Sequence, residues 1–196
     1  MSGKPIQTVS QTAGPFVHIG LVTRQAGFEV YENELGGDIA LPDTPGQRIC
    51  VEGAIYDGND EPVKDAVIEF WQADGEGRFA RPDANDGFRG WGRVGVDFET
   101  GRWRINTIKP GPVPEAEDTV HAPHICLWII ARGINIGLNT RLYFDDEKEA
   151  NVSDPLLSMI DSKERRETLM ASSKAEDHYE FKIKLQGDNE TVFLDV

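Results

Sequence analysis

The sequence predicts a mainly β fold, namely a two-sheet β sandwich of mixed topology with short helices and long loops. Apolar and polar residues alternate over short stretches, as where Trp103 and Ile105 alternate with Arg102 and Arg104. This period of two is that of a half-buried strand. Clusters of Gly, Pro, Asp and Asn separate these stretches, a pattern typical of sandwiches and barrels.

The size and charge of the chain limit its domain count and its partners. A chain of 196 residues suits one all-β domain, so we expect a single domain over residues 1–196. The 34 acidic and 20 basic side chains give a formal net charge of -14, which repels nucleic acid phosphates and anionic lipids. We therefore expect neither nucleic acid nor a membrane among the partners.

The start of the sequence and the cysteines indicate a compartment. Met1 is followed by the polar stretch SGKPIQTVSQ, which lacks the apolar core of a signal peptide. We therefore expect a cytoplasmic protein in which Cys50 and Cys126 are free thiols. The longest apolar run, residues 125–131, is too short to cross a bilayer and predicts a buried strand.

The chain begins with a predicted arm and continues into strands. Residues 1–20 or so form the arm, because Gly14-Pro15 favours an extended or turned backbone. Residues 24–47 show no sustained period and predict an irregular segment. Two β-rich runs at 49–55 and 63–71 flank a turn-forming Asp-Gly cluster, which indicates a hairpin or a sandwich corner. Strand patterns recur at 94–98, 101–108, 125–131, 140–144, 179–185 and 191–194.

Helices are predicted only in the last third of the chain. Asp154 can cap the first of them, and Pro155 suits its first helical position. Its apolar face comprises Leu156, Leu157 and Ile160. A second helical stretch is predicted over residues 163–172.

One cluster carries metal-ligand chemistry. His121, His124 and Cys126 form a His-x-x-His-x-Cys pattern, whose nitrogen and sulfur donors suit a transition metal. His124 and Cys126 share one face of the predicted strand. The other interpretation is that His124 is a hydrogen-bonded core histidine and Cys126 a small buried hydrophobe. The spacing alone leaves both interpretations open.

Several segments together resemble the intradiol ring-cleavage dioxygenases, in order and at fitting separations. They are QTAGP at 11–15, VIEFWQA at 67–73, TIKPG at 107–111, HI at 124–125, ARGINIGL at 131–138 and RLYFDD at 141–146. The resemblance covers nearly the whole chain and is weakest between residues 24 and 47. It implies a β-sandwich enzyme that uses O2 to cleave a catechol ring between the two hydroxyl-bearing carbons.

The metal ligands of that family are mostly missing here. The resemblance implies an iron-bearing chain that holds Fe(III) with two tyrosines and two histidines. The matching positions in this sequence are Phe79, Val113, His124 and Cys126, so three of the four ligands are absent. His121 stands where the family has an arginine, and the chain's tyrosines lie elsewhere in the sequence, at Tyr31, Tyr56, Tyr143 and Tyr179. We therefore expect a vestigial site, without a metal in this chain.

The resemblance also implies a role for a chain without iron. It would be an alpha chain, inactive alone, that pairs with a homologous beta chain carrying Fe(III) and completes the beta chain's substrate pocket. The residues that would line the shared pocket are Thr12, Gly14, Pro15 and Arg132. The planar fork of Arg132 matches a carboxylate, and Gly14 lets backbone approach a ligand closely.

The implied substrates are protocatechuate, a catechol with one carboxylate, and O2. The implied product is 3-carboxy-cis,cis-muconate, formed in bacterial degradation of aromatics by the β-ketoadipate route. For Arg132 the alternative is an ordinary surface ion pair, and for Gly14-Pro15 it is an ordinary turn.

Two other functions stay open at this point. A transthyretin-like β-sandwich binding module would share the strand-turn-strand pattern of residues 53–71, but it would not require the segments at 109–111 and 131–138. A self-sufficient metalloenzyme would use His121, His124 and Cys126. Metal analysis of the isolated chain distinguishes the metalloenzyme from the alpha chain. Copurification with a homologue that carries Tyr and His ligands distinguishes the binding module from the alpha chain.

Overall fold

A computed structural model describes residues 6, 8–32, 36–37, 39–81, 87–116 and 119–195, to which all structural statements below refer. Residues 1–5 and 7 of the predicted arm, and residues 33–35 and 38 of the predicted irregular segment, lie outside the described residues. The described part of residues 24–47 contains no helix and no strand longer than an isolated bridge at Ala40, as predicted.

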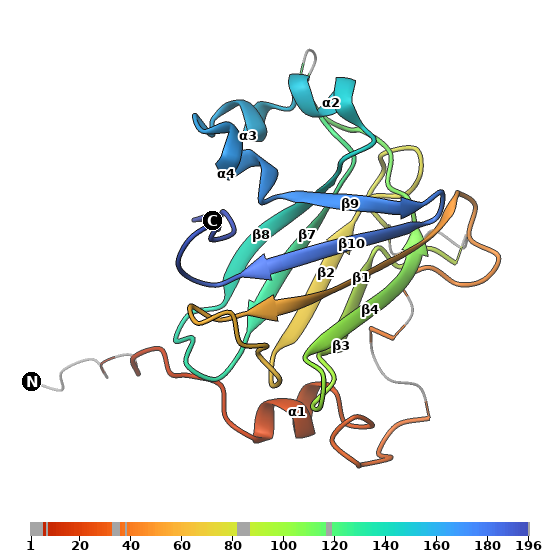
Figure 1. The fold of residues 1–196 in the computed structure, drawn as a ribbon. Coiled ribbons are helices and arrows are strands. Elements are labelled where there is room, and N and C mark those ends of the chain that lie inside the picture. The colour runs from red at the N-terminus through yellow and green to blue at the C-terminus, as the bar shows by residue number, and fades with distance from the viewer. Residues whose placement is uncertain are drawn as a thin grey trace, which may run out of the picture.

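The main feature of the fold is an eight-stranded sheet with the order β3-β2-β7-β8-β9-β10-β1-β4 (Figure 1). β1 pairs in parallel with β10, and β8 with β9, whereas the other neighbours are antiparallel. The predicted mainly β class with mixed strand directions is therefore confirmed. The strands are β1 (Arg48–Tyr56), β2 (Val67–Gln72), β3 (Trp91–Gly95), β4 (Arg102–Ile108), β7 (His124–Ile130), β8 (Leu138–Phe144), β9 (Met170–Ala175) and β10 (His178–Lys184).

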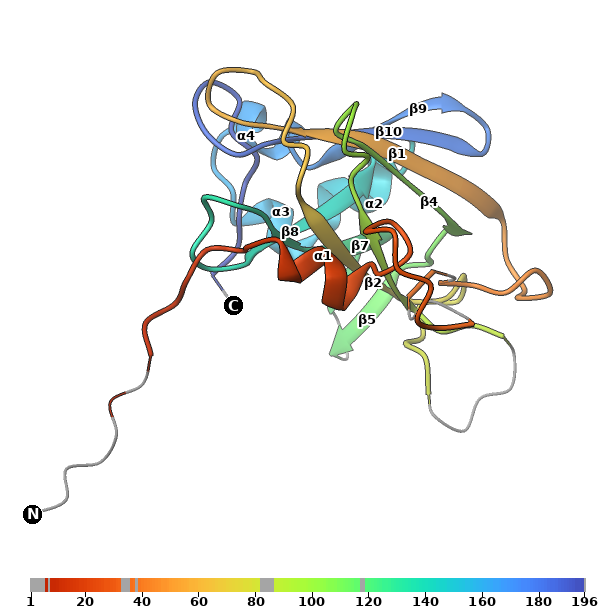
Figure 2. The same cartoon turned by 90° about the horizontal axis from the view of Figure 1, so that it is seen from below.

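The sheet folds back on itself, so that β3-β2-β7-β8 faces β9-β10-β1-β4 across a common core (Figure 2). The two halves are joined where Tyr143 and Phe144 of β8 pair with Met170 and Ala171 of β9. Hydrogen bonding thus gives one nearly barrel-like sheet, in place of the two separate sheets that we predicted. Buried side chains from both halves fill the core, among them Ile55, Phe70, Trp103, Leu127 and Phe181.

The connection between β1 and β2 is a corner rather than a hairpin. β1 lies between β10 and β4, and β2 lies between β3 and β7, so the Asp57-Gly58 turn carries the chain from one half of the sheet to the other. A separate two-stranded ribbon, β5 (Val113–Ala116) and β6 (Thr119–His121), leads into β7.

Four short helices lie at the two ends of the sheet. α1 (Phe16–Leu21) is at one end, and α2 (Lys148–Ser153), α3 (Pro155–Ser158) and α4 (Lys163–Glu167) are at the other (Figure 1). Asp154 caps α3 as predicted, since its Oδ1 accepts from the backbone N–H of Leu157 at 2.8 Å. The arm was predicted without a helix, but it contains α1.

Two predicted elements differ from the structure. The helix expected over 163–172 ends with α4, because residues from Met170 onward form β9 and pair with β10. Tertiary pairing here overrides local propensity. The strand expected over 191–194 is only a bridge between Asn139 and Leu194. Cys50 and Cys126 are both free, and among the described residues no helix has the length and apolar character needed to span a membrane.

Candidate functional site

The positions that match the family's iron ligands lie around the start of β7. His124 is buried at the first residue of β7, and Cys126 follows two residues later on the same strand. Val113 is buried at the start of β5, opposite His121 of β6. The rings of Phe79 and Trp71 contact each other, with their centroids 6.5 Å apart. Trp71 of β2 is in turn the register partner of Cys126 on β7. We call the four matching positions, Phe79, Val113, His124 and Cys126, together with the residues that contact them, the vestigial centre.

A guanidinium group lies within the vestigial centre. The register of β7 and β8 places Arg141 opposite Cys126 and Tyr143 opposite His124. Nη1 of Arg141 donates to Nδ1 of His121 at 3.2 Å and to the Tyr143 hydroxyl at 3.4 Å. The imidazole of His121, which stands where the resemblance implied an arginine, is thus itself bonded to an arginine, Arg141 of β8.

A buried carboxylate fixes the other side of this network. Asp154 is fully buried, and its Oδ1 accepts from the Tyr143 hydroxyl at 3.1 Å. Its Oδ2 accepts from the backbone N–H of Ala122 at 2.9 Å. Asp154 therefore ties the start of α3 to β8 and to the residues just before β7.

Sequence reasoning missed Arg141 and Tyr143. Tyr143 lies far from the motifs in sequence, yet its ring centroid is 5.7 Å from that of His124. The signal was available in the predicted strands at 125–131 and 140–144, because antiparallel neighbours place every second residue of both on one face. Tyr143 nevertheless supplies no free phenolate, since its hydroxyl bonds Asp154 and Arg141.

The protonation states of the vestigial centre oppose a ferric site. Burial, assisted by the charge of Arg141, lowers the pKa of His124 to about 4, so this imidazole is neutral at pH 7. Burial raises the pKa of the Cys126 thiol, although Arg141 acts in the opposite direction. Burial also raises the pKa of the Tyr143 phenol. His124, Cys126 and Tyr143 are thus neutral at pH 7, and the charged guanidinium of Arg141 lies beside them.

These residues do not fit Fe(III). Ferric iron in this family is stabilised by anionic phenolate oxygens, and here two ligand positions hold hydrocarbon side chains while Arg141 adds a positive charge that repels a metal cation. Within the described part of the chain, donors that converge within 4.8 Å occur at Cys50, Glu52 and His178, and not at His121, His124 or Cys126.

The predicted pocket-lining residues lie at the opposite end of β7. The hydroxyl of Thr12 accepts from the backbone N–H of Gly133 at 2.6 Å, so the arm lies beside Arg132. Gly14 and Pro15 are exposed, and a Cβ added to Gly14 would meet nothing within 4 Å. The structure therefore brings Thr12, Gly14, Pro15 and Arg132 to one exposed surface, which we call the arm surface.

Arg132 itself makes a single ion pair. Its Nε lies 3.1 Å from Oδ2 of Asp65, and its side chain is 82% exposed. This is the surface ion pair that we weighed against a substrate-binding role. Because a strand rises about 3.3 Å per residue, the ends of the seven-residue β7 separate the arm surface from the vestigial centre by roughly 20 Å.

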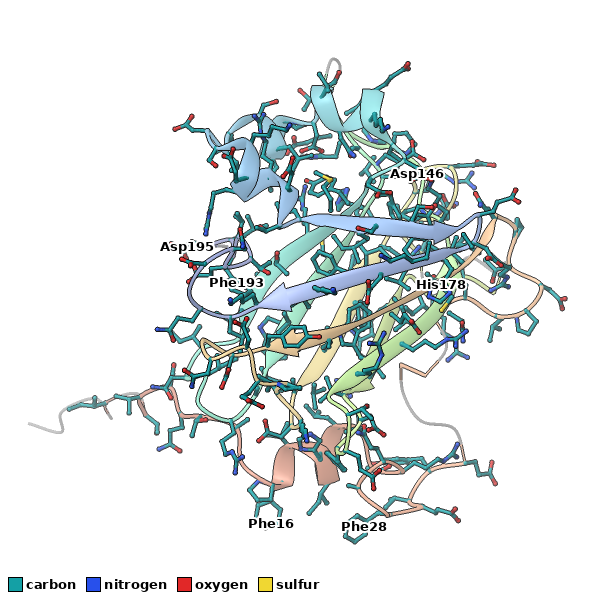
Figure 3. All side chains as sticks on the ribbon, in the orientation of Figure 1. Phe16, Phe28, Asp146, His178, Phe193 and Asp195 are labelled. Atoms are coloured by element: carbon teal, nitrogen blue, oxygen red, sulfur yellow. The ribbon has the colours of Figure 1, made fainter. Side chains whose placement is uncertain are left out.

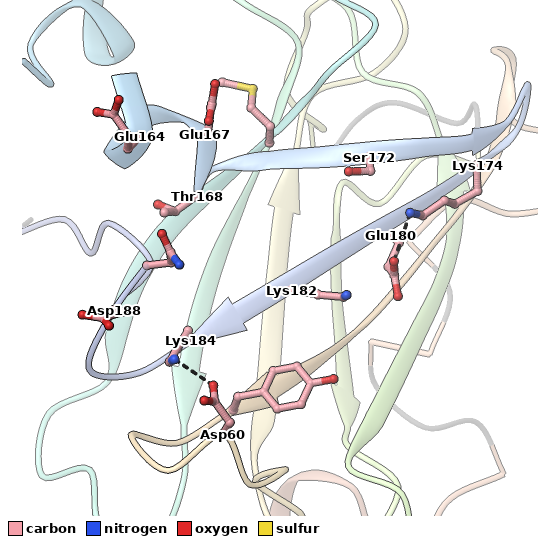
Figure 4. Close-up of a pocket in the computed structure, with 13 residues that line it drawn as sticks. Asp60, Glu164, Glu167, Thr168, Ser172, Lys174, Glu180, Lys182, Lys184 and Asp188 are labelled. Atoms are coloured by element: carbon pink, nitrogen blue, oxygen red, sulfur yellow. Dashed lines mark ion pairs between the residues drawn. The ribbon is translucent and has the colours of Figure 1, made fainter. Parts of the chain in front are cut away.

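The outer face of β9 and β10 carries a further hollow, of about 610 Å³. Two ion pairs lie within it, Lys174 with Glu180 at 3.2 Å and Lys184 with Asp60 at 2.7 Å (Figure 4). None of the family's matching positions lines it. The hollow is therefore separate from the positions that the resemblance singles out at the two ends of β7.

Comparison with known proteins agrees with the resemblance. The family model described as "Dioxygenase" matches residues 32–187. The chain is 45% identical over 193 residues, 96% of both chains, to the protocatechuate 3,4-dioxygenase alpha chain of Pseudomonas putida. It is 34% identical over 121 residues, 58% of this chain and 48% of the relative, to the protocatechuate 3,4-dioxygenase beta chain of Burkholderia cepacia.

A solved structure supports the fold. Catechol 1,2-dioxygenase from Pseudomonas arvilla C-1 superposes with a TM-score of 0.60 at 19% identity, over 76% of this chain and 55% of the other. At that identity the likeness concerns the fold alone. Together with the match along the sequence, it shows that the chain belongs to the intradiol ring-cleavage dioxygenase family.

Proposed function

We propose that this chain is the non-iron alpha subunit of a protocatechuate 3,4-dioxygenase and completes the active site of an iron-bearing beta chain. The observation that carries the proposal is the state of the vestigial centre. A fold that matches the family along its length has Phe79, Val113 and Cys126 at three ligand positions, and Arg141 lies among them. Such a chain has no means of activating a catechol by itself.

The proposed reaction takes protocatechuate and O2 to 3-carboxy-cis,cis-muconate. Fe(III) in the beta chain supplies the activation of the catechol and O2. This chain supplies orientation, because the Arg132 guanidinium can form two parallel hydrogen bonds to the carboxylate of protocatechuate. We place this reaction in the cytoplasm.

The geometry of the arm surface favours such a role. An exposed ion pair such as that of Arg132 with Asp65 contributes at most about 1 kcal/mol, so a substrate carboxylate can take the place of Asp65. Thr12 holds the arm beside Arg132, and the exposed Gly14-Pro15 step leaves room for a ligand or a neighbouring chain. The arm surface lies far from the chain's own vestigial centre, so the pocket it would line belongs to another chain.

Exposed apolar side chains supply an interface. Phe16 and Ile136, at 83% and 71% exposure, lie near the arm surface in sequence, and Trp71, Phe79 and Trp128 are also well exposed. Trp71 and Phe79 contact each other, with ring centroids 6.5 Å apart, and exposed aromatic side chains in contact are typical of protein interfaces. We propose the beta chain as the partner. We also propose a single domain, because β1 and β10, the first and last strands of the sheet in sequence, pair with each other.

The two alternatives have less support. A transthyretin-like binding module gives no reason for the family match over residues 32–187. A self-sufficient metalloenzyme would need His121, His124 and Cys126 as ligands, but their donor atoms do not converge within 4.8 Å in the described part of the chain.

The test is to produce this chain alone and together with a tagged homologous beta chain. We expect the chain alone to hold no stoichiometric iron, to lack visible tyrosinate-to-iron absorption, to be inactive and to aggregate. With the beta chain it should copurify and turn over protocatechuate. Stoichiometric ferric iron in the single chain, or a monomer in size-exclusion chromatography that ignores the beta chain, would contradict the proposal.

A further inference from the structure

A cluster of three different metal-binding side chains lies on the half of the sheet away from the vestigial centre. Cys50 and Glu52 are two residues apart on β1 and so share its outer face. His178, where β10 begins (Figure 3), is the direct register partner of Cys50. The Sγ, carboxylate oxygen and imidazole nitrogen all lie within 4.8 Å of one another.

The separations approach those of a tetrahedral ion. Zinc binds sulfur at about 2.3 Å and nitrogen or oxygen at about 2.0–2.2 Å, which places tetrahedral donors roughly 3.3–3.6 Å apart. Nε2 of His178 lies 3.3 Å from Oε1 of Glu52, so this pair already has the required spacing. The thiol must approach by little more than about 1 Å, within reach of a side-chain rotation.

We propose that Cys50, Glu52 and His178 form a binding site for Zn²⁺ or a similar borderline divalent cation. Thiolate and imidazole select this class of ion over the hard cations Mg²⁺ and Ca²⁺. Three protein ligands leave the fourth position to water. The three ligands lie on β1 and at the start of β10, apart from the vestigial centre on β7.

The strands hold the ligands in place. The backbone N–H of Cys50 donates to the Asp177 carbonyl at 2.7 Å, directly before His178. Ligands on paired strands are positioned more firmly than ligands on loops. All three side chains are half-buried, which leaves an entry path for an ion from solvent.

Two arginines compete with the ion. Nη2 of Arg102 donates to Oε1 of Glu52 at 3.2 Å, and the Arg104 guanidinium lies beside the Cys50 thiol. A bound cation must displace at least the first of them from Glu52. The cluster is a poor candidate for a nucleophilic thiol, because burial raises the pKa of Cys50 and a thiolate is what attacks.

The test uses the complex with the beta chain, because the chain alone is expected to aggregate. The complex keeps its iron, is kept reduced and is titrated with zinc against a chromophoric chelator. We expect one zinc ion per chain. Cys50→Ala and His178→Ala should each weaken binding by at least about tenfold, since even losing a supporting residue costs 10–100-fold. Cys126→Ala, which removes the other thiol, should leave binding unchanged.

A gain-of-affinity variant makes the test sharper. Arg102→Gln frees Glu52 from its competitor and should tighten zinc binding, whereas a merely structural cluster predicts no gain. Cobalt in place of zinc should show thiolate-to-metal absorption that disappears in Cys50→Ala. Thermal unfolding confirms that each variant is folded. No zinc binding, or binding that is equal in Cys50→Ala, His178→Ala and the parent chain, would overturn the proposal.

Discussion

Arg141 and Arg132 carry the same group in opposite surroundings. Arg141 lies within the vestigial centre, bonded to His121 and Tyr143, whereas Arg132 is 82% exposed and makes one ion pair with Asp65. A guanidinium that is already bonded in a buried network is part of the structure, and one that is loosely paired can exchange its partner for a ligand. The comparison therefore separates two ends of β7. At the closed end, the vestigial centre, the arginine is bonded in a buried network, and at the open end, the arm surface, the arginine is loosely paired.

The largest expected effect tests the closed end. Asp154→Ala removes a buried carboxylate that accepts from Leu157, Ala122 and Tyr143. Because a hydrogen bond to a charged group contributes about 1.5–3 kcal/mol, we expect a loss of more than about 3 kcal/mol in the free energy of unfolding. Urea unfolding measures it. The exposed Asp161→Ala is the matched control and should stay within about 0.5 kcal/mol; equal losses would mean that the buried network contributes nothing.

An acid titration tests the same end. The pKa of His124 is about 4 in the folded chain and 6.5 otherwise, so the unfolded state binds a proton that the folded state refuses. The contribution of neutral His124 to the free energy of unfolding is fully present above pH 6.5. It is lost as the pH falls toward 4, by about 3 kcal/mol in all. His124→Gln should lose less over this range. Parallel stability curves for the two proteins from pH 7 to pH 4 would show that His124 is not held neutral by burial.

The open end is tested by activity. In the assembled enzyme, Arg132→Ala should lower kcat/KM for protocatechuate by about 10–100-fold, the value of one hydrogen bond to a charged group. A catechol without a carboxylate should be turned over as before, and the iron content should not change. An equal loss for both substrates would assign Arg132 to the interface or the fold, and an unchanged kcat/KM would leave it as the ion pair with Asp65.

The smallest effect is also at the open end. Arg132→Ala should change the free energy of unfolding by no more than about 0.5 kcal/mol, because exposed ion pairs contribute little. Thermal unfolding of the complex measures it. A loss above about 2 kcal/mol would mean that Arg132, like Arg141, is part of the structure and is not loosely paired.

Local signals predicted much of the fold. Asp154 and Pro155 gave the start of α3 correctly, and the alternation at 101–108 and 179–185 predicted β4 and β10 to within one residue at each end. Elements that depend on distant partners were missed. β9 has a sequence, MASSKA, without a strand period, and it is a strand because β10 and β8 lie beside it.

The sites divide in the same way. The four ligand positions followed from the family's motifs, but Arg141 and Tyr143 entered the vestigial centre through the register of β7 and β8. Cys50, Glu52 and His178 belong to no motif and meet only because the first and last strands of the sheet pair. Register between strands far apart in sequence is set by the whole core and not by local pattern.

That pairing of the first and last strands also sets an order of events during protein synthesis. Cys50 pairs with His178, which the ribosome adds 128 positions later (178 minus 50). At about 5–20 residues per second, β1 waits roughly 6–26 s with one edge open. An open edge is a template for wrong pairing, so this interval is when the chain is most exposed to aggregation. The sheet closes only after nearly the whole chain has been made.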